Sequence, residues 1–237
     1  MLIKGLQKHT LLDYPGRIAC TIFLFGCNFK CSFCHNPELV DAKQASELKT
    51  YSREEILQFL KGRKEFLGAV CITGGEPTLN KDLPEFLRQI KKLGYKIKLD
   101  TNGTNPEMLK ILLEKNLVDY AAMDFKAPLK KYKQVVNADV NIKKIKKSIN
   151  IIKKFPDYEF RITILPKIIS KSGLIEMAEY LKERKANKKF FLQEFRAKKC
   201  LDKSFENEKP FSEKEMHDFL KMLMPYFEHV EIRGETY

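Results

Sequence analysis

The sequence predicts a parallel α/β fold, a partial barrel of six strand–helix units built as a single domain over residues 1–237. Short apolar runs rich in Ile, Val, Phe and Leu alternate with helical patterns along almost the whole chain, which is typical of parallel strands covered on both faces. A chain of 237 residues is long enough to bury one large core. The conspicuous polar motifs follow directly after strands, where parallel barrels place their functional loops.

Each strand is predicted from an apolar run. The six parallel strands are expected at Arg17–Phe25, Ala69–Thr73, Lys96–Asp100, Tyr120–Asp124, Glu159–Leu165 and Phe190–Phe195. A last strand, Val230–Arg233, follows the final helix. The N-terminal residues Leu2–Gln7 are expected to form a hairpin with the first parallel strand, because the sequence Asp13-Tyr14-Pro15-Gly16 between them is typical of a turn.

The helices between the strands are predicted from their end signals. Ser52 and Ser212 are each followed three residues later by Glu, which is the pattern of a capping box. Asn105 precedes a proline in the first turn of another helix, and Gly94 ends the helix that begins near Pro84. Residues 39–50 are polar and without periodicity, so we expect an irregular, mobile loop there.

Composition excludes some classes of protein. The chain is 43% hydrophobic and 32% charged, as an ordered soluble domain is. Its longest apolar stretch, residues 18–27, is far below the ~20 residues of a membrane span, and the N-terminus has no signal-peptide layout, so a cytoplasmic protein is expected. The net charge of +13 comes from lysines spread along the chain. Without interleaved aromatic and basic residues on one element, this charge does not indicate nucleic-acid binding.

The strongest motif is a run of three cysteines, Cys27, Cys31 and Cys34. In a reducing compartment, clustered cysteines are metal ligands more often than disulfides. A cubane iron–sulfur cluster needs four ligands, yet no fourth cysteine lies nearby. If a cluster binds here, one iron stays open, which is typical of a catalyst rather than of an electron carrier.

Two alternatives remain for these cysteines. A zinc site would use His35 as the fourth ligand, although adjacent side chains such as Cys34 and His35 point apart in most conformations and no second CxxC pair exists. In the other alternative the thiols are merely buried, as we expect for Cys20 and Cys71 within strands.

Three further motifs follow the next three strands: Gly74-Gly75-Glu76-Pro77, Asp100-Thr101-Asn102-Gly103 and Met123-Asp124-Phe125-Lys126. Two adjacent glycines let a backbone approach a ligand closely. The carboxylates of Asp100 and Asp124 can hold an ammonium group or a cation, and Lys126 can meet a carboxylate. Their convergence on one rim predicts a site for a small zwitterionic ligand beside the cysteines.

The cysteine spacing followed by Gly-Gly-Glu-Pro resembles the radical S-adenosylmethionine superfamily. The longer sequence segment from Phe25-Gly26-Cys27-Asn28 to Cys34-His35-Asn36-Pro37 is similar to that of the glycyl-radical-enzyme activating branch of this superfamily. Within that branch the chain most resembles the activating protein of anaerobic ribonucleoside-triphosphate reductase, with pyruvate formate-lyase activase as a close relative. Residues 36–70 contain no cysteine, so the ferredoxin-like insertion of several activases is absent.

The resemblance implies one [4Fe–4S] cluster on Cys27, Cys31 and Cys34, whose open iron chelates S-adenosylmethionine. It implies cofactor-binding roles for Phe33, His35, Gly74, Gly75, Glu76, Asp100, Asp124, Phe125, Lys126, Arg161 and Arg196. The segment Gln193–Arg196 is expected to lie near the adenosine. A monovalent-cation site is implied at Asp100, Thr101, Met123 and Asp124. No side chain is assigned as catalytic, because the cluster and the cofactor carry the radical chemistry.

The implied function is reductive cleavage of S-adenosylmethionine to a 5′-deoxyadenosyl radical that takes hydrogen from a glycine of a partner glycyl radical enzyme. The expected electron donor is a flavodoxin or a ferredoxin. One alternative is a compact radical enzyme acting on a small molecule, such as 7-carboxy-7-deazaguanine synthase. Another is an iron–sulfur or zinc-binding regulatory module without enzymatic activity.

Overall fold

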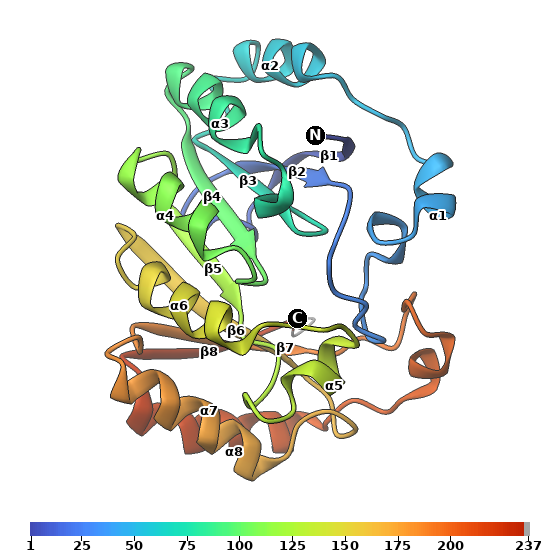
Figure 1. Ribbon diagram of the computed structural model, residues 1–237, viewed down its shortest axis with the longest axis vertical. Helices are drawn as coiled ribbons and strands as arrows, with labels where there is room; N and C mark the ends of the chain where they lie inside the picture. Colours follow the sequence, from blue (N-terminus) through green and yellow to red (C-terminus); the bar gives the residue numbers. More distant parts are fainter. Residues whose placement is uncertain (235–237) are drawn as a thin grey trace.

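The computed structural model describes residues 1–234 and contains one eight-stranded sheet in the order β1 to β8 (Figure 1). Strand β1 (Ile3–Thr10) runs antiparallel to β2 (Ala19–Leu24), and every later pair of neighbours is parallel. The later strands are β3 (Ala69–Gly74), β4 (Lys96–Thr101), β5 (Tyr120–Asp124), β6 (Asp157–Ile164), β7 (Lys189–Glu194) and β8 (His229–Arg233). The predicted partial barrel with an N-terminal hairpin strand is therefore confirmed.

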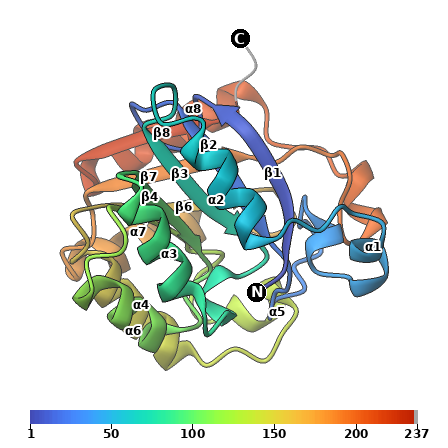
Figure 2. The same ribbon diagram turned by 90° about the horizontal axis from the view of Figure 1, so that it is seen from above.

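Helices connect the parallel strands across the outside of the curved sheet (Figures 1 and 2). The longer ones are α2 (Arg53–Lys61), α3 (Leu83–Lys92), α4 (Pro106–Glu114), α6 (Ile142–Ile152), α7 (Lys171–Glu183) and α8 (Glu213–Leu223). Two short helices, α1 (Ala42–Ser46) and α5 (Tyr132–Val136), lie in the loops nearer the carboxyl ends of the strands. Across residues 1–234, none of the helices has the length and apolar character that a membrane crossing requires.

The two capping boxes predicted at helix starts are both formed. Both arms of the capping box at Ser52 are formed with Glu55, at 2.6 Å and 3.0 Å, and the box at Ser212 is also complete. The expectation of an irregular loop at residues 39–50 is wrong in part, because α1 forms there. Asp41 caps it by accepting a hydrogen bond from the backbone N–H of Lys43 at 2.9 Å.

The two faces of the barrel wall differ in character, as β6 illustrates. Alternate residues of a strand point to opposite faces. Phe160, Ile162 and Ile164 join the hydrophobic core. The residues that alternate with them include Glu159 and Arg161, which lie among other charged groups together with Lys98 of β4. The apolar runs thus predict the strands correctly, but the inner face of this barrel is charged.

The parallel register brings the ends of the strands to one rim. Leu24 at the end of β2 lies opposite Gly74 of β3, and Thr101 of β4 lies opposite Met123 of β5. The loops that follow these strands carry the four sequence motifs, so all four meet at the same edge of the sheet.

Candidate functional site

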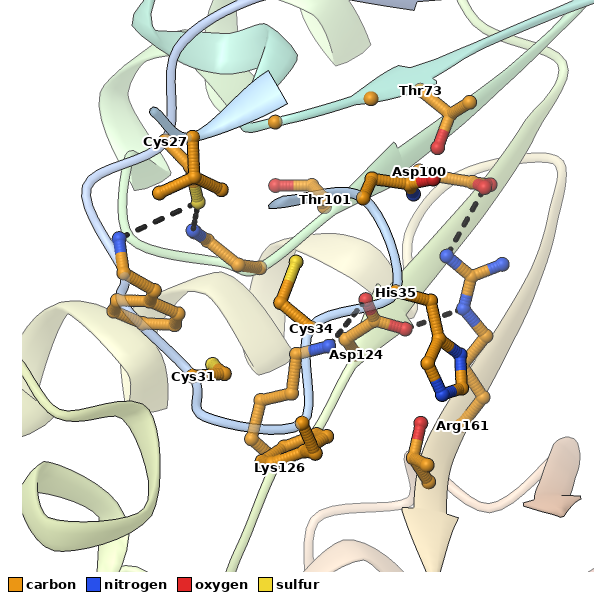
Figure 3. Close-up of a pocket in the computed structure, with 18 of the residues that line it drawn as sticks. Cys27, Cys31, Cys34, His35, Thr73, Asp100, Thr101, Asp124, Lys126 and Arg161 are labelled. Carbon is orange, nitrogen blue, oxygen red and sulfur yellow. Dashed lines mark hydrogen bonds and ion pairs between the residues drawn. The ribbon is translucent and has the colours of Figure 1, made fainter. Parts of the chain in front are cut away.

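The three cysteines of the loop after β2 line one pocket at the carboxyl ends of the strands (Figure 3). The loop starts at Gly26, whose φ of +100° favours glycine. All three are free thiols, and burial raises the pKa of Cys27 to about 11 and that of Cys31 to about 12. Iron binds thiolates, so cluster binding at these cysteines must release protons.

The surroundings of Cys27 fit an iron–sulfur cluster. The backbone N–H of Phe29 donates to the Cys27 Sγ at 3.4 Å, and the Asn102 Nδ2 lies 3.9 Å from the same sulfur (Figure 3). Donors of this kind surround ligand sulfurs in iron–sulfur sites. His35, the fourth ligand in the zinc alternative, instead stacks on Phe195 with ring centroids 5.4 Å apart.

The two glycines after β3 have a structural role that sequence reasoning missed. A Cβ on Gly74 would lie 2.4 Å from the carbonyl oxygen of Leu24, and a Cβ on Gly75 would lie 2.1 Å from that of Gly26. The Gly75 N–H donates to Leu24 O at 2.8 Å, and the Glu76 N–H donates to Gly26 O at 2.7 Å. The glycines therefore let this loop pack against the start of the cysteine loop, and both also line the pocket.

Glu76 lies behind the pocket wall. Its side chain is fully buried, and its carboxylate accepts hydrogen bonds from both the backbone N–H and the hydroxyl of Thr78. It also accepts from the Thr101 hydroxyl at 2.8 Å and from the Asn102 N–H at 2.6 Å. Burial raises the pKa of Glu76, although these donors oppose the shift. In this arrangement Glu76 organises the neighbouring loops, and its cofactor-binding role stays a prediction.

A buried ion-pair network forms the wall opposite Cys27 (Figure 3). Arg161 of β6 contacts Asp124 through its Nε at 2.5 Å and Asp100 through its Nη2 at 3.0 Å. Lys126 pairs with the other oxygen of Asp124 at 2.9 Å, and Lys98 pairs with Asp100 at 2.5 Å. Four predicted site residues on three different strands and their loops are thus joined directly.

The network fixes the charges of its members. Burial alone would raise the pKa of Asp124, but the adjacent Arg161 and Lys126 outweigh it and hold that pKa well below its usual value. Burial would likewise lower the pKa of Lys126, yet Asp124 raises it. Asp100 shows the same net lowering of its pKa, caused by Arg161 and Lys98 against burial. Both carboxylates are therefore ionised and both cations protonated near neutral pH.

The residues of the predicted cation site are engaged with other groups. Asp100 and Asp124 pair with the protein's own cations, and the Thr101 hydroxyl donates to Glu76. Met123 is fully buried, and its Cε lies 2.1 Å from where a Cβ on Gly103 would be. This arrangement gives no support to a cation at these four residues.

The remaining predicted residues fall into two groups. Phe33 and His35 line the pocket, and the Lys126 Nζ lies 6.0 Å from the centre of the Phe33 ring. Phe125 is fully buried against Tyr132 and Tyr180, outside the lining. Arg196 donates to the carbonyl oxygen of Gly234 at 2.7 Å and is also outside the lining.

Several lining residues were given no site role of their own from the sequence, although some belong to the motifs: Phe29, Asn36, Val40, Thr73, Asn102 and Thr163. The period-two rule could have found Thr163, because it lies two residues after Arg161 on the same face of β6. Gln193 of β7 lines the pocket as the predicted Gln193–Arg196 segment requires.

Gly75→Ala tests the close packing of the two loops. The new Cβ would meet the backbone of Gly26, which cannot rotate away, so we expect a loss of about 1–3 kcal/mol in the free energy of unfolding. Iron bound after anaerobic reconstitution should also fall, because the cysteine loop must shift. Gly62→Ala at the end of α2 is the control, since its Cβ meets nothing closer than 3.8 Å. Equal urea midpoints and iron contents for the two variants would contradict the packing argument.

Arg161→Met tests the ion-pair network. Asp100 and Asp124 would stay buried without their shared counter-ion, so we expect the free energy of unfolding to fall by about 3–5 kcal/mol at neutral pH. The exposed Arg88, paired with Glu85, is the control, and Arg88→Met should change stability by less than about 0.5 kcal/mol.

The pH dependence of this loss has a definite sign. In the wild type the low pKa of Asp124 makes its stabilisation complete above about pH 5 and lost only as the pH falls toward that folded pKa. In Arg161→Met, only Lys126 and Lys98 remain to oppose the effect of burial, so the pKa values of Asp124 and Asp100 rise above those in the wild type, and the variant loses less stability than the wild type as the pH falls. The difference in the free energy of unfolding between the wild type and Arg161→Met, measured in urea, should therefore become smaller as the pH falls. If this difference in the free energy of unfolding did not change with pH, it would not arise from the ionised carboxylates of the network, and the assignment of Arg161 as their counter-ion would be wrong.

Comparisons with known proteins agree with this site. A family model described as the radical SAM superfamily matches residues 21–187, which include the three cysteines and Arg161. A protein of Methanocaldococcus jannaschii named as a glycyl-radical enzyme activating enzyme is 33% identical over 98% of this chain and 95% of its own.

Solved structures share the fold at low identity. QueE from Escherichia coli matches with a TM-score of 0.61 and 15% identity, over 99% of this chain and 94% of its own. SuiB from Streptococcus suis, in complex with S-adenosylmethionine, matches with a TM-score of 0.66 and 16% identity, over 90% of this chain, which spans about half of SuiB (49%). Taken with the family match over most of the chain, the geometry leads to one assignment: the chain belongs to the radical SAM superfamily.

Proposed function

We propose that the protein is a glycyl-radical enzyme activating enzyme and that its partner is an anaerobic ribonucleoside-triphosphate reductase. The observation that carries the radical SAM part of this proposal is the single pocket that joins the three cysteines to the network of Asp100, Asp124, Lys126 and Arg161. The match with the M. jannaschii protein, which spans nearly the full length of both chains, supports the activating role.

In this proposal Cys27, Cys31 and Cys34 hold a [4Fe–4S] cluster. When bound, the reduced cluster supplies the electron that cleaves S-adenosylmethionine to methionine and a 5′-deoxyadenosyl radical, which takes a hydrogen atom from a glycine Cα of the partner. A flavodoxin or a ferredoxin is the proposed source of that electron. The work of the protein is to bind, orient and shield these groups.

The charged wall suits the amino-acid end of S-adenosylmethionine. Lys126 offers a cation to its carboxylate, and Asp124 offers an anion to its ammonium group. Because both are already paired and buried, they need little reorganisation when the ligand binds. Phe33 on the same pocket offers an aromatic face for the adenine, and His35, which stacks on Phe195, also lines the pocket.

The first test is cleavage of S-adenosylmethionine. The anaerobically reconstituted protein, mixed with dithionite and S-adenosylmethionine, should yield 5′-deoxyadenosine measured by chromatography. Cys31→Ala should lose iron and product together, whereas Cys71→Ala, which replaces a buried cysteine outside the pocket, should retain its iron. No product from a wild type with a full cluster would reject both enzymatic functions and leave the iron–sulfur regulatory module.

The second test identifies the partner by electron paramagnetic resonance. Mixing the active enzyme with an anaerobic ribonucleoside-triphosphate reductase should produce a stable glycyl-radical doublet. A reductase with its radical-site glycine replaced by alanine is the control and should give no doublet. Abundant 5′-deoxyadenosine without a doublet from any candidate glycyl radical enzyme would instead favour the small-molecule function, such as 7-carboxy-7-deazaguanine synthesis.

A further inference from the structure

The orientation of the Asn102 side-chain amide is fixed by its neighbours. Its Oδ1 accepts a hydrogen bond from the Thr104 backbone N–H at 3.0 Å and another from the Thr104 hydroxyl at 2.7 Å. An amide oxygen accepts and an amide nitrogen donates, so the N–H donor identifies which end is the oxygen. The Nδ2 must then lie at the opposite end, which faces the cysteine loop.

Both hydrogens of this Nδ2 have acceptors. One is directed to the Asn28 Oδ1 at 2.9 Å, and Asn28 is held in turn because its own Nδ2 donates to the Thr104 hydroxyl at 3.0 Å. The other hydrogen is available to the Cys27 Sγ, 3.9 Å from the Asn102 Nδ2. The amide therefore presents an N–H to a cysteine of the metal-binding motif.

The backbone of Asn102 is held as firmly as its side chain. Its N–H donates to the Glu76 carboxylate at 2.6 Å, and the residue is only 5% exposed. A buried donor with a fixed orientation acts on its neighbour continuously, whereas an exposed amide would exchange partners with water. The Phe29 N–H also donates to the Cys27 sulfur, at 3.4 Å. This donor belongs to the backbone, so it does not depend on the side chain at position 29, whereas the Asn102 donor does.

We propose that Asn102 is a positioning residue that raises the reduction potential of the cluster through a hydrogen bond to the Cys27 sulfur. The inference rests on the proposed function because it requires the cluster. Reduction adds one electron and thus one negative charge to the cluster and its ligands. A donor at a ligand sulfur stabilises that charge more in the reduced than in the oxidised state, so it favours reduction. Within residues 1–234, Asn102 is the residue that supplies a side-chain donor to the sulfur of Cys27, Cys31 or Cys34.

The test is a redox titration of the reconstituted protein, in which electron paramagnetic resonance measures the reduced cluster. At the wild-type midpoint, Asn102→Leu should lower the ratio of reduced to oxidised cluster about fivefold, the effect of one lost hydrogen bond. Asn102→Asp, which keeps the acceptor for Thr104 but replaces the donor with a negative oxygen, should lower the ratio further. Asn80→Leu is the control, since the Asn80 amide is half-buried and donates to Pro77 O at 3.1 Å rather than to a cysteine.

Each outcome decides the inference. An unchanged midpoint in either Asn102 variant with full iron content overturns it and leaves the proposed function standing. Loss of the cluster from both variants assigns Asn102 a purely structural role and also overturns it. Conversely, a lowered midpoint in the variants, together with a wild type that does not form 5′-deoxyadenosine, would support the role of Asn102 while rejecting the proposed function.

Discussion

The buried carboxylate of Glu76 is the interaction on which the site depends. A fully buried carboxylate is costly unless donors surround it, and here Thr78, Thr101 and Asn102 supply them. The backbone N–H of Glu76 meanwhile donates to Gly26 at the start of the cysteine loop. One residue thus joins the loops that follow β2, β3 and β4, so the three loops hold a common geometry that none could maintain alone.

The ion pairs inside the barrel are better explained by the site than by stability. Replacing a buried ion pair with apolar residues is often neutral or stabilising, so such pairs are weak evidence for a stabilising role. The chain nevertheless continues them away from the rim, where Arg233 of β8 contacts both oxygens of Glu159, near the start of β6, at 2.6 Å and 2.9 Å. Charges that already hold one another in a fixed arrangement meet a ligand with little reorganisation, which is the property that a cofactor site requires.

The sequence was sufficient for features that depend on periodicity and chain direction. Apolar runs located the strands, and parallel strands bring their ends together, so the convergence of Cys27, Gly75, Asp100 and Asp124 could be expected. Boundaries were less accurate: β1 continues to Thr10, beyond its predicted end. Strand ends depend on pairing with a neighbour, which local propensity does not encode.

Contacts between strands could not be read from the sequence. Lys98 and Glu159 lie within runs that look apolar. Lys98 pairs with Asp100 and Glu159 with Arg161, and these pairings depend on register and on which face each residue takes. The same limit applies to Arg196, which was expected at the pocket but bonds to Gly234 instead. The glycine pair was expected to make room for a ligand, yet its tightest contact is the backbone of Gly26, a proximity that only the tertiary structure creates.

The end of β4 and the turn after it show how much depends on register. Consecutive residues there serve different partners: Asp100 pairs with Arg161, Thr101 donates to Glu76, and Asn102 faces Cys27. Gly103 follows with a φ of +77°, a conformation that favours glycine and brings its backbone against Met123. Because successive side chains point in opposite directions, a shift by one residue would exchange all three partners at once. The charge network, the buried carboxylate and the cysteine loop are therefore set by a single strand register, that of β4.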